Sequence, residues 1–153
     1  MSIANKEKEE LRLNLISTLE VKLDKCNSEL KEINQIKKLD SKSSAGDKFE
    51  TSVEMTQQEV NKHSILRESL ENQLDVLKKL ADRKVEDKVS VGSLVVTNNG
   101  KFYISVGIGV VKADTGTYFV ISRESPLGSE LMGKSSGDKL NFNGRDYKIT
   151  ELG

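Results

Sequence analysis

The sequence predicts an α+β protein: a long antiparallel α-helical coiled-coil hairpin in residues 1–87, then a small β-sheet domain with one short helix in residues 88–153. The first observation is that ten of the eleven glycines and the single proline lie after residue 87. The second is that apolar residues change from helical spacing to short runs of β-branched and aromatic residues. The third is that 31% of the residues are charged and 35% apolar, which suits two helices with much solvated surface.

The charge balance and the single cysteine exclude several classes of protein. Lysine plus arginine and aspartate plus glutamate both number 24, so wholesale electrostatic binding to nucleic acid or to a membrane is not expected. Cys26 is the only cysteine, which excludes an intramolecular disulfide and fits a reducing compartment. The N-terminal stretch "MSIANKEKEELRLNL" is not a signal peptide, and no apolar run approaches the roughly 18 residues of a membrane helix. We therefore expect a cytoplasmic protein.

The hairpin is expected to consist of helices over residues 5–40 and 48–83. The first helix carries apolar residues at alternating steps of three and four, the spacing of a heptad seam: Ile16, Leu19, Leu23, Cys26, Leu30 and Ile33. The second helix has its own apolar series: Phe49, Val53, Val60, Leu66, Leu70, Leu74, Leu77 and Leu80. Because the connector is short, the helices are expected to fold back on each other over a length of about 50 Å.

The expected register of the hairpin places Cys26 beside His63. Pairing the helices about a turn near residue 44 makes the numbers of facing residues add up to roughly 89. We interpret this pair as a polar spot in a narrow apolar seam, because a metal or redox role would need further ligands that the register does not bring near. His63 is the only histidine, and it faces the seam, so no nucleophile–histidine–acid set is available.

The second domain is expected to contain five short strands and one helix. Residues 91–114 are expected to form two strands joined by an Asn-Asn-Gly turn, and residues 116–125 a third. Ser125 is a plausible N-cap for a short helix with Pro126 at its first position. A hairpin around Asn143-Gly144 closes the domain, and the aromatic residues on the strands are expected in the core.

The far end of the hairpin is acidic. The stretch "LDSKSSAGDKFETSVEM" places Asp40, Asp47, Glu50 and Glu54 in a tip near residues 40–54. Asp47 and Glu50 have the spacing of a capping box, which would satisfy the backbone N–H groups at the start of the second helix. Two carboxylates one turn apart on an exposed helix start can also share a Mg²⁺ ion when another molecule supplies the remaining ligands. Both interpretations stay open at this point.

Two stretches of the chain resemble a known family. The C-terminal stretch "ISRESPLGSELMGKSSGDKLNFNGRDYKITEL" resembles the C-terminal domain of the bacterial Gre-type transcript-cleavage elongation factors. That family shows Ser-Pro, Gly-Lys and Gly-Asp in this order, which here are Ser125-Pro126, Gly133-Lys134 and Gly137-Asp138. The tip sequence "GDKFE" resembles the family's Gly-Asp-x-x-Glu, with Asp47 and Glu50 at the acidic positions. The order of hairpin and domain matches the family along nearly the whole chain.

The resemblance implies a transcription elongation factor that binds bacterial RNA polymerase. An FKBP-like C-terminal domain would dock at the mouth of the secondary channel, and the coiled coil would enter that channel as a monomer. The tip would help to hold Mg²⁺ in the polymerase active centre, where backtracked RNA is cut, and the polymerase would remain the enzyme. The implied metal-binding residues, which assist catalysis, are Asp47 and Glu50, and the isolated protein is not expected to bind Mg²⁺ tightly. The implied partner-binding residues are Glu124, Ser125, Pro126 and Leu127.

The tip departs from the family pattern, which leaves other functions open. Thr51-Ser52-Val53-Glu54-Met55 stands where the family continues Asn-Ala-Glu-Tyr, so the third tip carboxylate is displaced by one residue, or about 100° around a helix. The protein could thus inhibit or modulate the polymerase from the same channel without cleavage, or be a coiled-coil adaptor. Lysines surround the tip-side half of the hairpin and could contact the RNA 3′ end, although a solvated helix face is favoured: Lys37, Lys38, Lys42, Lys48 and Lys62.

Overall fold

A computed structural model describes the backbone of residues 3–41 and 46–153, and the side chains of residues 4–36 and 57–153. The chain divides into two compact units. The first, which we call the sheet unit, consists of Met1–Ile16 and Val76–Gly153, and the second, the helical unit, is Ser17–Asp75. The division into domains at residues 87 and 88 stays a prediction.

Two long helices make up the first half of the chain, as expected from the apolar spacing. Helix α1 is Ile3–Ser41 and helix α2 is Gly46–Lys79, followed by the 3-10 turn η1, Leu80–Asp82. In the part of the chain that the structure describes, no helix is both long and apolar enough to cross a bilayer.

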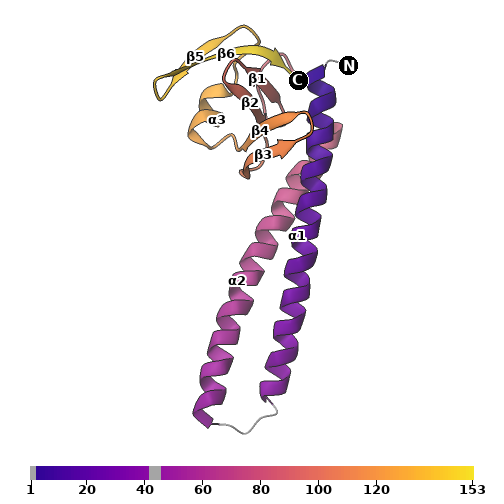
Figure 1. The fold of residues 1–153 in the computed structure, drawn as a ribbon, viewed down its shortest axis with the longest axis vertical. Coiled ribbons are helices and arrows are strands. Elements are labelled where there is room, and N and C mark those ends of the chain that lie inside the picture. The colour runs from indigo at the N-terminus through magenta and orange to yellow at the C-terminus, as the bar shows by residue number, and fades with distance from the viewer. Residues whose placement is uncertain (1–2, 42–45) are drawn as a thin grey trace. The chain divides into compact units, whose positions relative to one another are not determined.

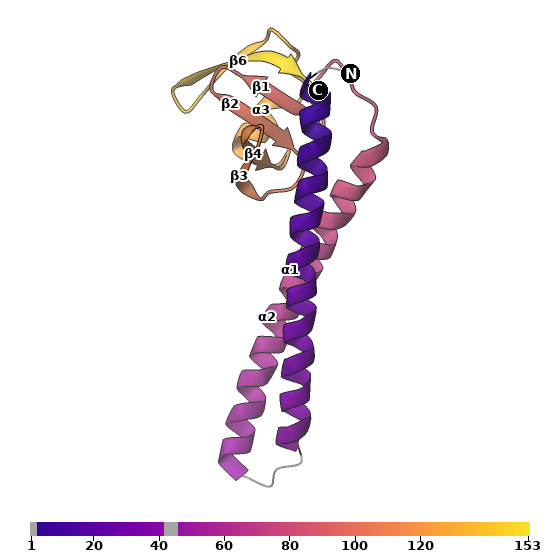
Figure 2. The same ribbon diagram turned by 45° about the vertical axis from the view of Figure 1, so that its right-hand side comes forward.

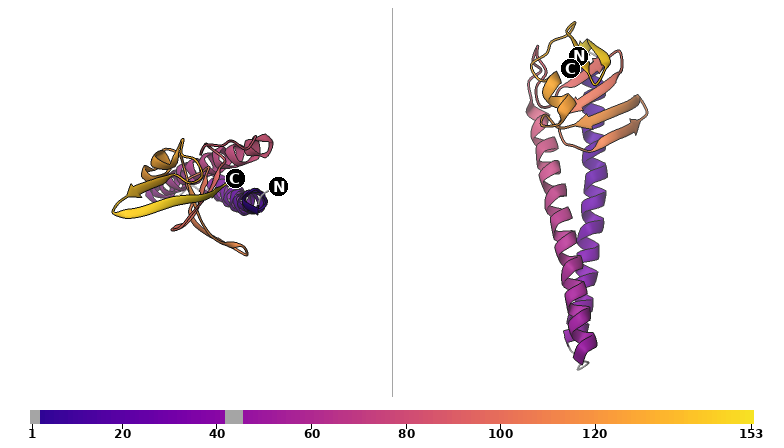
Figure 3. Two further views of the ribbon diagram at one scale, coloured as in Figure 1. Left: turned by 90° about the horizontal axis from the view of Figure 1, so that it is seen from above. Right: turned by 90° about the vertical axis from the view of Figure 1, so that its left-hand side faces the viewer.

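In the helical unit, the two helices run antiparallel and side by side (Figures 1 and 3). The expected neighbourhood of Cys26 and His63 is confirmed, because the Cys26 thiol lies 3.2 Å from the backbone carbonyl oxygen of His63. Leu66, which was expected in the seam, is instead 49% exposed. The buried apolar residues of this unit come from both helices: Leu19, Cys26, Leu30, Leu70 and Leu74.

The sheet unit contains one mixed sheet, in the order β3-β4-β2-β1-β6-β5 (Figures 1 and 2). Strands β2 and β4 pair in parallel, and the other neighbours pair antiparallel. The strands are β1 Leu94–Thr97, β2 Gly100–Ile104, β3 Gly109–Ala113, β4 Gly116–Ile121, β5 Lys139–Phe142 and β6 Arg145–Leu152. The short helix α3, Pro126–Leu131, connects β4 to β5. The described residues thus form an α+β fold, as the sequence predicts.

The expectation of five strands was wrong, because six strands occur in the described residues. Residues 91–114 were expected to hold two strands, but β2 ends at Ile104 and Gly109 starts a separate strand, β3. Gly109 has a φ of 100°, a conformation that favours glycine and allows the chain to turn out of one strand and into the next. Strand β3 then pairs with β4 through the close Ala113–Gly116 turn.

The aromatic residues of the strands are mostly buried, as expected. Phe102 lies at the centre of the core, where its ring stacks on Phe119 at 5.2 Å and meets Tyr147 edge-on at 5.8 Å. The core cluster of buried residues is Val89, Val95, Phe102, Ile104, Leu131, Tyr147 and Ile149. This cluster contains Leu131 of α3 together with residues of β1, β2 and β6, so apolar packing against the sheet sets the position of α3.

The hairpin around Asn143-Gly144 is confirmed. Both residues have positive φ, 50° and 78°, and they join Phe142 to its partner Arg145. Two such residues form the two-residue turn that matches the twist of the flanking strands.

Candidate functional site

The two expected metal-binding residues of the acidic tip belong to the start of α2. Because α2 begins at Gly46, the backbone of Asp47 and Glu50 belongs to its first five residues. The side chains of residues 37–56 lie outside the described residues, and so do the four tip-side lysines from Lys37 to Lys48. The two interpretations of Asp47 and Glu50, as a capping box or as a pair of metal ligands, therefore rest on the sequence alone. Lys62, the remaining lysine of that group, is exposed on α2.

The expected docking segment lies between β4 and α3. Ser125 is the N-cap of α3: its hydroxyl accepts a hydrogen bond from the backbone N–H of Gly128 at 3.1 Å and donates to the carbonyl oxygen of Ser122 at 2.7 Å. Pro126 begins the helix, so the predicted cap is confirmed. A Cβ atom on Gly128 would lie 2.1 Å from the carbonyl oxygen of Ser122, so glycine is required at this position.

Two of the four expected docking residues are free to meet a partner. Glu124 and Pro126 are exposed, whereas Leu127 is half-buried and packs against the core cluster. The Glu124 carboxylate accepts a hydrogen bond from Arg123 at 3.1 Å, which lowers the pKa of Glu124. The segment therefore presents a carboxylate that stays ionised at neutral pH, beside a proline held in place by the cap.

A polar network that the sequence did not predict holds the base of α1 to the sheet. Glu7 accepts from the Lys101 ammonium at 2.8 Å and from the Tyr118 hydroxyl at 3.0 Å. These hydrogen bonds lower the pKa of Glu7, with the bond from Lys101 as the largest cause. Tyr118 also shares a hydrogen bond with Thr115 and lies under the Lys101 ammonium, which is 5.5 Å from the ring centre. No local pattern could reveal this network, because Glu7 is 94 residues from Lys101 and 111 residues from Tyr118 in the sequence.

The end of α2 is held by a side chain from the start of α1. Arg12 donates to the carbonyl oxygen of Leu77 at 3.1 Å and also binds Glu9 through two of its nitrogens, at 2.6 and 3.1 Å. The last carbonyls of a helix have no partner within the helix, so Arg12 serves as a cap for α2. In the sequence Arg12 looks like one more charged residue of a solvated helix face.

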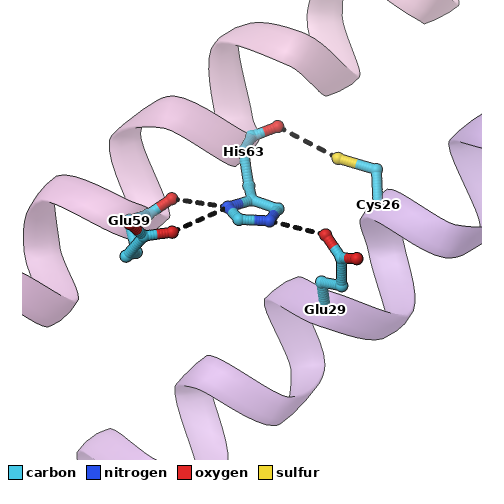
Figure 4. A network of polar contacts seen from close by, with 4 residues as sticks. All are labelled: Cys26, Glu29, Glu59 and His63. Atoms are coloured by element: carbon cyan, nitrogen blue, oxygen red, sulfur yellow. Dashed lines mark hydrogen bonds and ion pairs between the residues drawn. The ribbon is translucent and has the colours of Figure 1, made fainter.

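The middle of the helical unit holds a polar cluster around His63 (Figure 4). Its ring lies between the Glu29 carboxylate of α1, 2.7 Å from Nε2, and the Glu59 backbone carbonyl of α2, 2.8 Å from Nδ1. Hydrogen bonding to Glu59 and then to Glu29 raises the pKa of His63. The Cys26 thiol contacts the backbone of His63 rather than its ring.

Among the described side chains, no group of three or more histidine, cysteine, aspartate and glutamate residues is placed to hold a metal ion. An open cavity of about 530 Å³ lies at the β5–β6 hairpin, and its lining consists of Asn98, Lys139, Leu140, Asn141, Asp146, Tyr147 and Lys148. No protein-family model matches the chain, and no curated protein matches it at a significant level.

Proposed function

We propose that this protein is a transcription elongation factor of the Gre type that binds bacterial RNA polymerase and stimulates cleavage of backtracked RNA. The observation that carries the proposal is the turn before α3, where the Ser125 cap leaves Glu124 and Pro126 exposed. The same sequence carries the resemblance to the docking segment of that family. The two long helices α1 and α2, which precede the strands in the chain, support the proposal further, as they suit a coiled coil followed by an FKBP-like domain.

In this proposal the helical pair enters the secondary channel and brings Asp47 and Glu50 to the polymerase active centre. Their place at the start of α2 suits carboxylates, since the N-terminus of a helix carries a partial positive charge. These two residues would hold Mg²⁺ together with ligands from the polymerase and the RNA. When bound there, the ion supplies an activated water for attack on the phosphodiester. The protein contributes ligands and position, and the polymerase contributes the active site.

Docking would occur through the sheet unit. Glu124 offers an ionised carboxylate to a basic partner surface, and Pro126 and the edge of α3 offer a preformed shape beside it. The base of α1 belongs to the same unit and is tied to the sheet through Glu7. Glu124 would therefore contact the polymerase from a folded unit that also contains the first turns of α1.

Two alternatives to a cleavage factor are each favoured by a specific observation. The altered sequence after Glu50, with Glu54 displaced by one residue, favours a channel-binding modulator that does not stimulate cleavage. Exposed apolar side chains in the helical unit favour an adaptor that pairs with another helix, because Val21 is 67% exposed and Ile65 is 70% exposed.

The test is a transcript-cleavage assay on backtracked polymerase, comparing wild type with the Asp47→Ala/Glu50→Ala double variant. We expect the stimulated cleavage rate of the variant to be lower than that of wild type by about tenfold or more, which corresponds to an activation free energy higher by about 1.4 kcal/mol. The matched control is Glu68→Ala/Glu71→Ala, which removes two exposed carboxylates at the same spacing from the same helix. Equal rates for both double variants would contradict a metal-binding tip.

Polymerase binding separates the three functions. We expect Glu124→Ala to weaken binding, whereas Glu130→Ala, which removes an exposed carboxylate from α3 itself, should not. Binding without stimulated cleavage would favour the modulator. Absence of binding, together with a dimeric mass in solution, would favour the adaptor.

A further inference from the structure

Both ring nitrogens of His63 face hydrogen-bond acceptors. Nε2 lies 2.7 Å from a carboxylate oxygen of Glu29, and Nδ1 lies 2.8 Å from the backbone carbonyl oxygen of Glu59. The Glu59 carboxylate adds a third oxygen, 3.8 Å from Nδ1 (Figure 4). Neither an ionised carboxylate nor a carbonyl can donate a hydrogen bond. A ring that satisfies both contacts must therefore carry a proton on each nitrogen.

The neutral ring cannot keep both contacts. A neutral imidazole has one N–H group and one bare nitrogen, so one lone pair would face an oxygen. The Glu59 carbonyl is fixed in the backbone of α2, whereas the Glu29 side chain is 41% exposed and can turn into water. The neutral ring should thus keep its proton on Nδ1 and lose the contact to α1. The contact within α2 survives, and the contact between the helices opens.

We propose that the His63 ring is a pH-operated clasp between α1 and α2, closed while both ring nitrogens carry protons and opened by the loss of the Nε2 proton. This inference concerns the pairing of the helices and does not depend on the proposed function. The ring is well placed for such a role, since its side chain is only 14% exposed and it bridges the two helices of the helical unit. The Cys26 thiol, which bonds the His63 carbonyl, holds the same turn of α2 against α1 in either state.

The charges around the ring determine the direction of the effect. Glu29 faces it from α1 and Glu59 faces it from α2, and both favour the protonated form. Lys22 and Lys25 line the groove on the Glu29 side, and none of the described contacts joins either lysine to the His63 ring. Because the pKa of His63 is raised in the folded protein, its stabilising effect is fully present below the unfolded pKa of about 6.5 and is lost as the pH rises through the folded pKa.

The experiment is an NMR titration of the ring nitrogens in the 153-residue chain, which has one histidine and so gives an unambiguous signal. The same chain unfolded in urea provides the reference. We expect both nitrogens to be protonated at pH 6, a titration midpoint above the reference, and the Nδ1–H tautomer at high pH. A midpoint equal to the reference, or a neutral ring protonated on Nε2, would overturn the proposal.

Two variants test the contact between the helices. Glu29→Gln should move the midpoint toward the reference, while Glu32→Gln, an exposed carboxylate one turn further along α1, should leave it unchanged. Urea unfolding supplies a second readout: wild type should lose stability between pH 6 and pH 8.5 relative to His63→Gln, whose side chain does not titrate. If Glu29→Gln titrates like wild type, or if His63→Gln shows the same pH dependence as wild type, there is no clasp.

Discussion

Replacing Arg12 with methionine should destabilise the sheet unit by about 2 kcal/mol. Methionine keeps the apolar stem but removes the guanidinium group, which bonds the carbonyl oxygen of Leu77 two residues before the end of α2. The Arg12 side chain is only 8% exposed, so water reaches the freed carbonyl poorly. The change therefore removes a hydrogen bond from the carbonyl group of a buried residue near the end of α2, since Leu77 is 0% exposed.

The magnitude follows from the environment of each partner. A hydrogen bond to a charged group contributes about 1.5–3 kcal/mol, and this range already includes the favourable charge at the helix C-terminus. Burial of methionine in place of a guanidinium offsets a part of the loss. Glu9 is 48% exposed and returns to water when Arg12 is removed, so the ion pair itself contributes only about 0–1 kcal/mol. The expected net loss in the free energy of unfolding is therefore about 2 kcal/mol, near the middle of the range for a hydrogen bond to a charged group.

Urea unfolding measures this loss of stability. The unfolding is followed by both circular dichroism and tyrosine fluorescence, because the chain has two compact units and the two probes show whether they unfold together. With a slope of about 2 kcal/mol per molar urea, the midpoint should fall by about 1 M. The matched variant is Glu9→Gln, which keeps Arg12 and the cap but removes the charge of its exposed partner. If Arg12→Met costs no more than Glu9→Gln, the cap does not stabilise α2 and the reasoning is refuted.

Two further predictions concern the sheet unit. Ser125→Ala should lower the free energy of unfolding by about 1 kcal/mol, because the backbone N–H of Gly128 loses its acceptor, whereas Ser125→Thr keeps a hydroxyl that can both accept and donate and should cost much less; a thermal melt in which the two variants are equal would contradict the cap. Burial raises the pKa of Tyr103 to about 12, so absorbance at high pH, compared with Tyr103→Phe, should show this residue ionising near pH 12 rather than near pH 10. Since the folded pKa lies above the unfolded one, the stabilising effect of Tyr103 is present below about pH 10 and is lost between about pH 10 and pH 12.

The elements that the sequence predicted well are those with local causes. The heptad spacing of residues 16–33 predicts a long helix, because the same face recurs at every turn. Ser125 and Pro126 start a helix wherever the chain places them, and Asn143-Gly144 favours a tight turn for reasons of backbone conformation alone. Strand β3 was missed since it shares its residue types with its neighbours, and only its pairing with β4 defines it as a strand of its own.

The candidate site divides in the same way. The residues of the docking segment could be named from sequence, and the structure adds that Ser125 is occupied with capping while Glu124 is exposed. Glu7 and Arg12 gave no signal, because their partners lie far along the chain and ordinary charged residues of a helix look the same. For Asp47 and Glu50 the sequence is still the only source, as their side chains lie outside the described residues.

The sequence by itself determined the α+β class, the two long helices and the register that brings Cys26 to His63, since periodicity and the length of a connector act over a few turns of chain. Only the tertiary structure decided the parallel pairing of β2 with β4 and the attachment of Glu7 to Lys101. It alone also decided that both nitrogens of the His63 ring face oxygen atoms. Apart from the contact of Nδ1 with Glu59 within α2, these contacts join groups whose separation in sequence carries no information about their distance in space. They form because burial of the apolar faces brings the elements together and leaves their polar groups to find partners there.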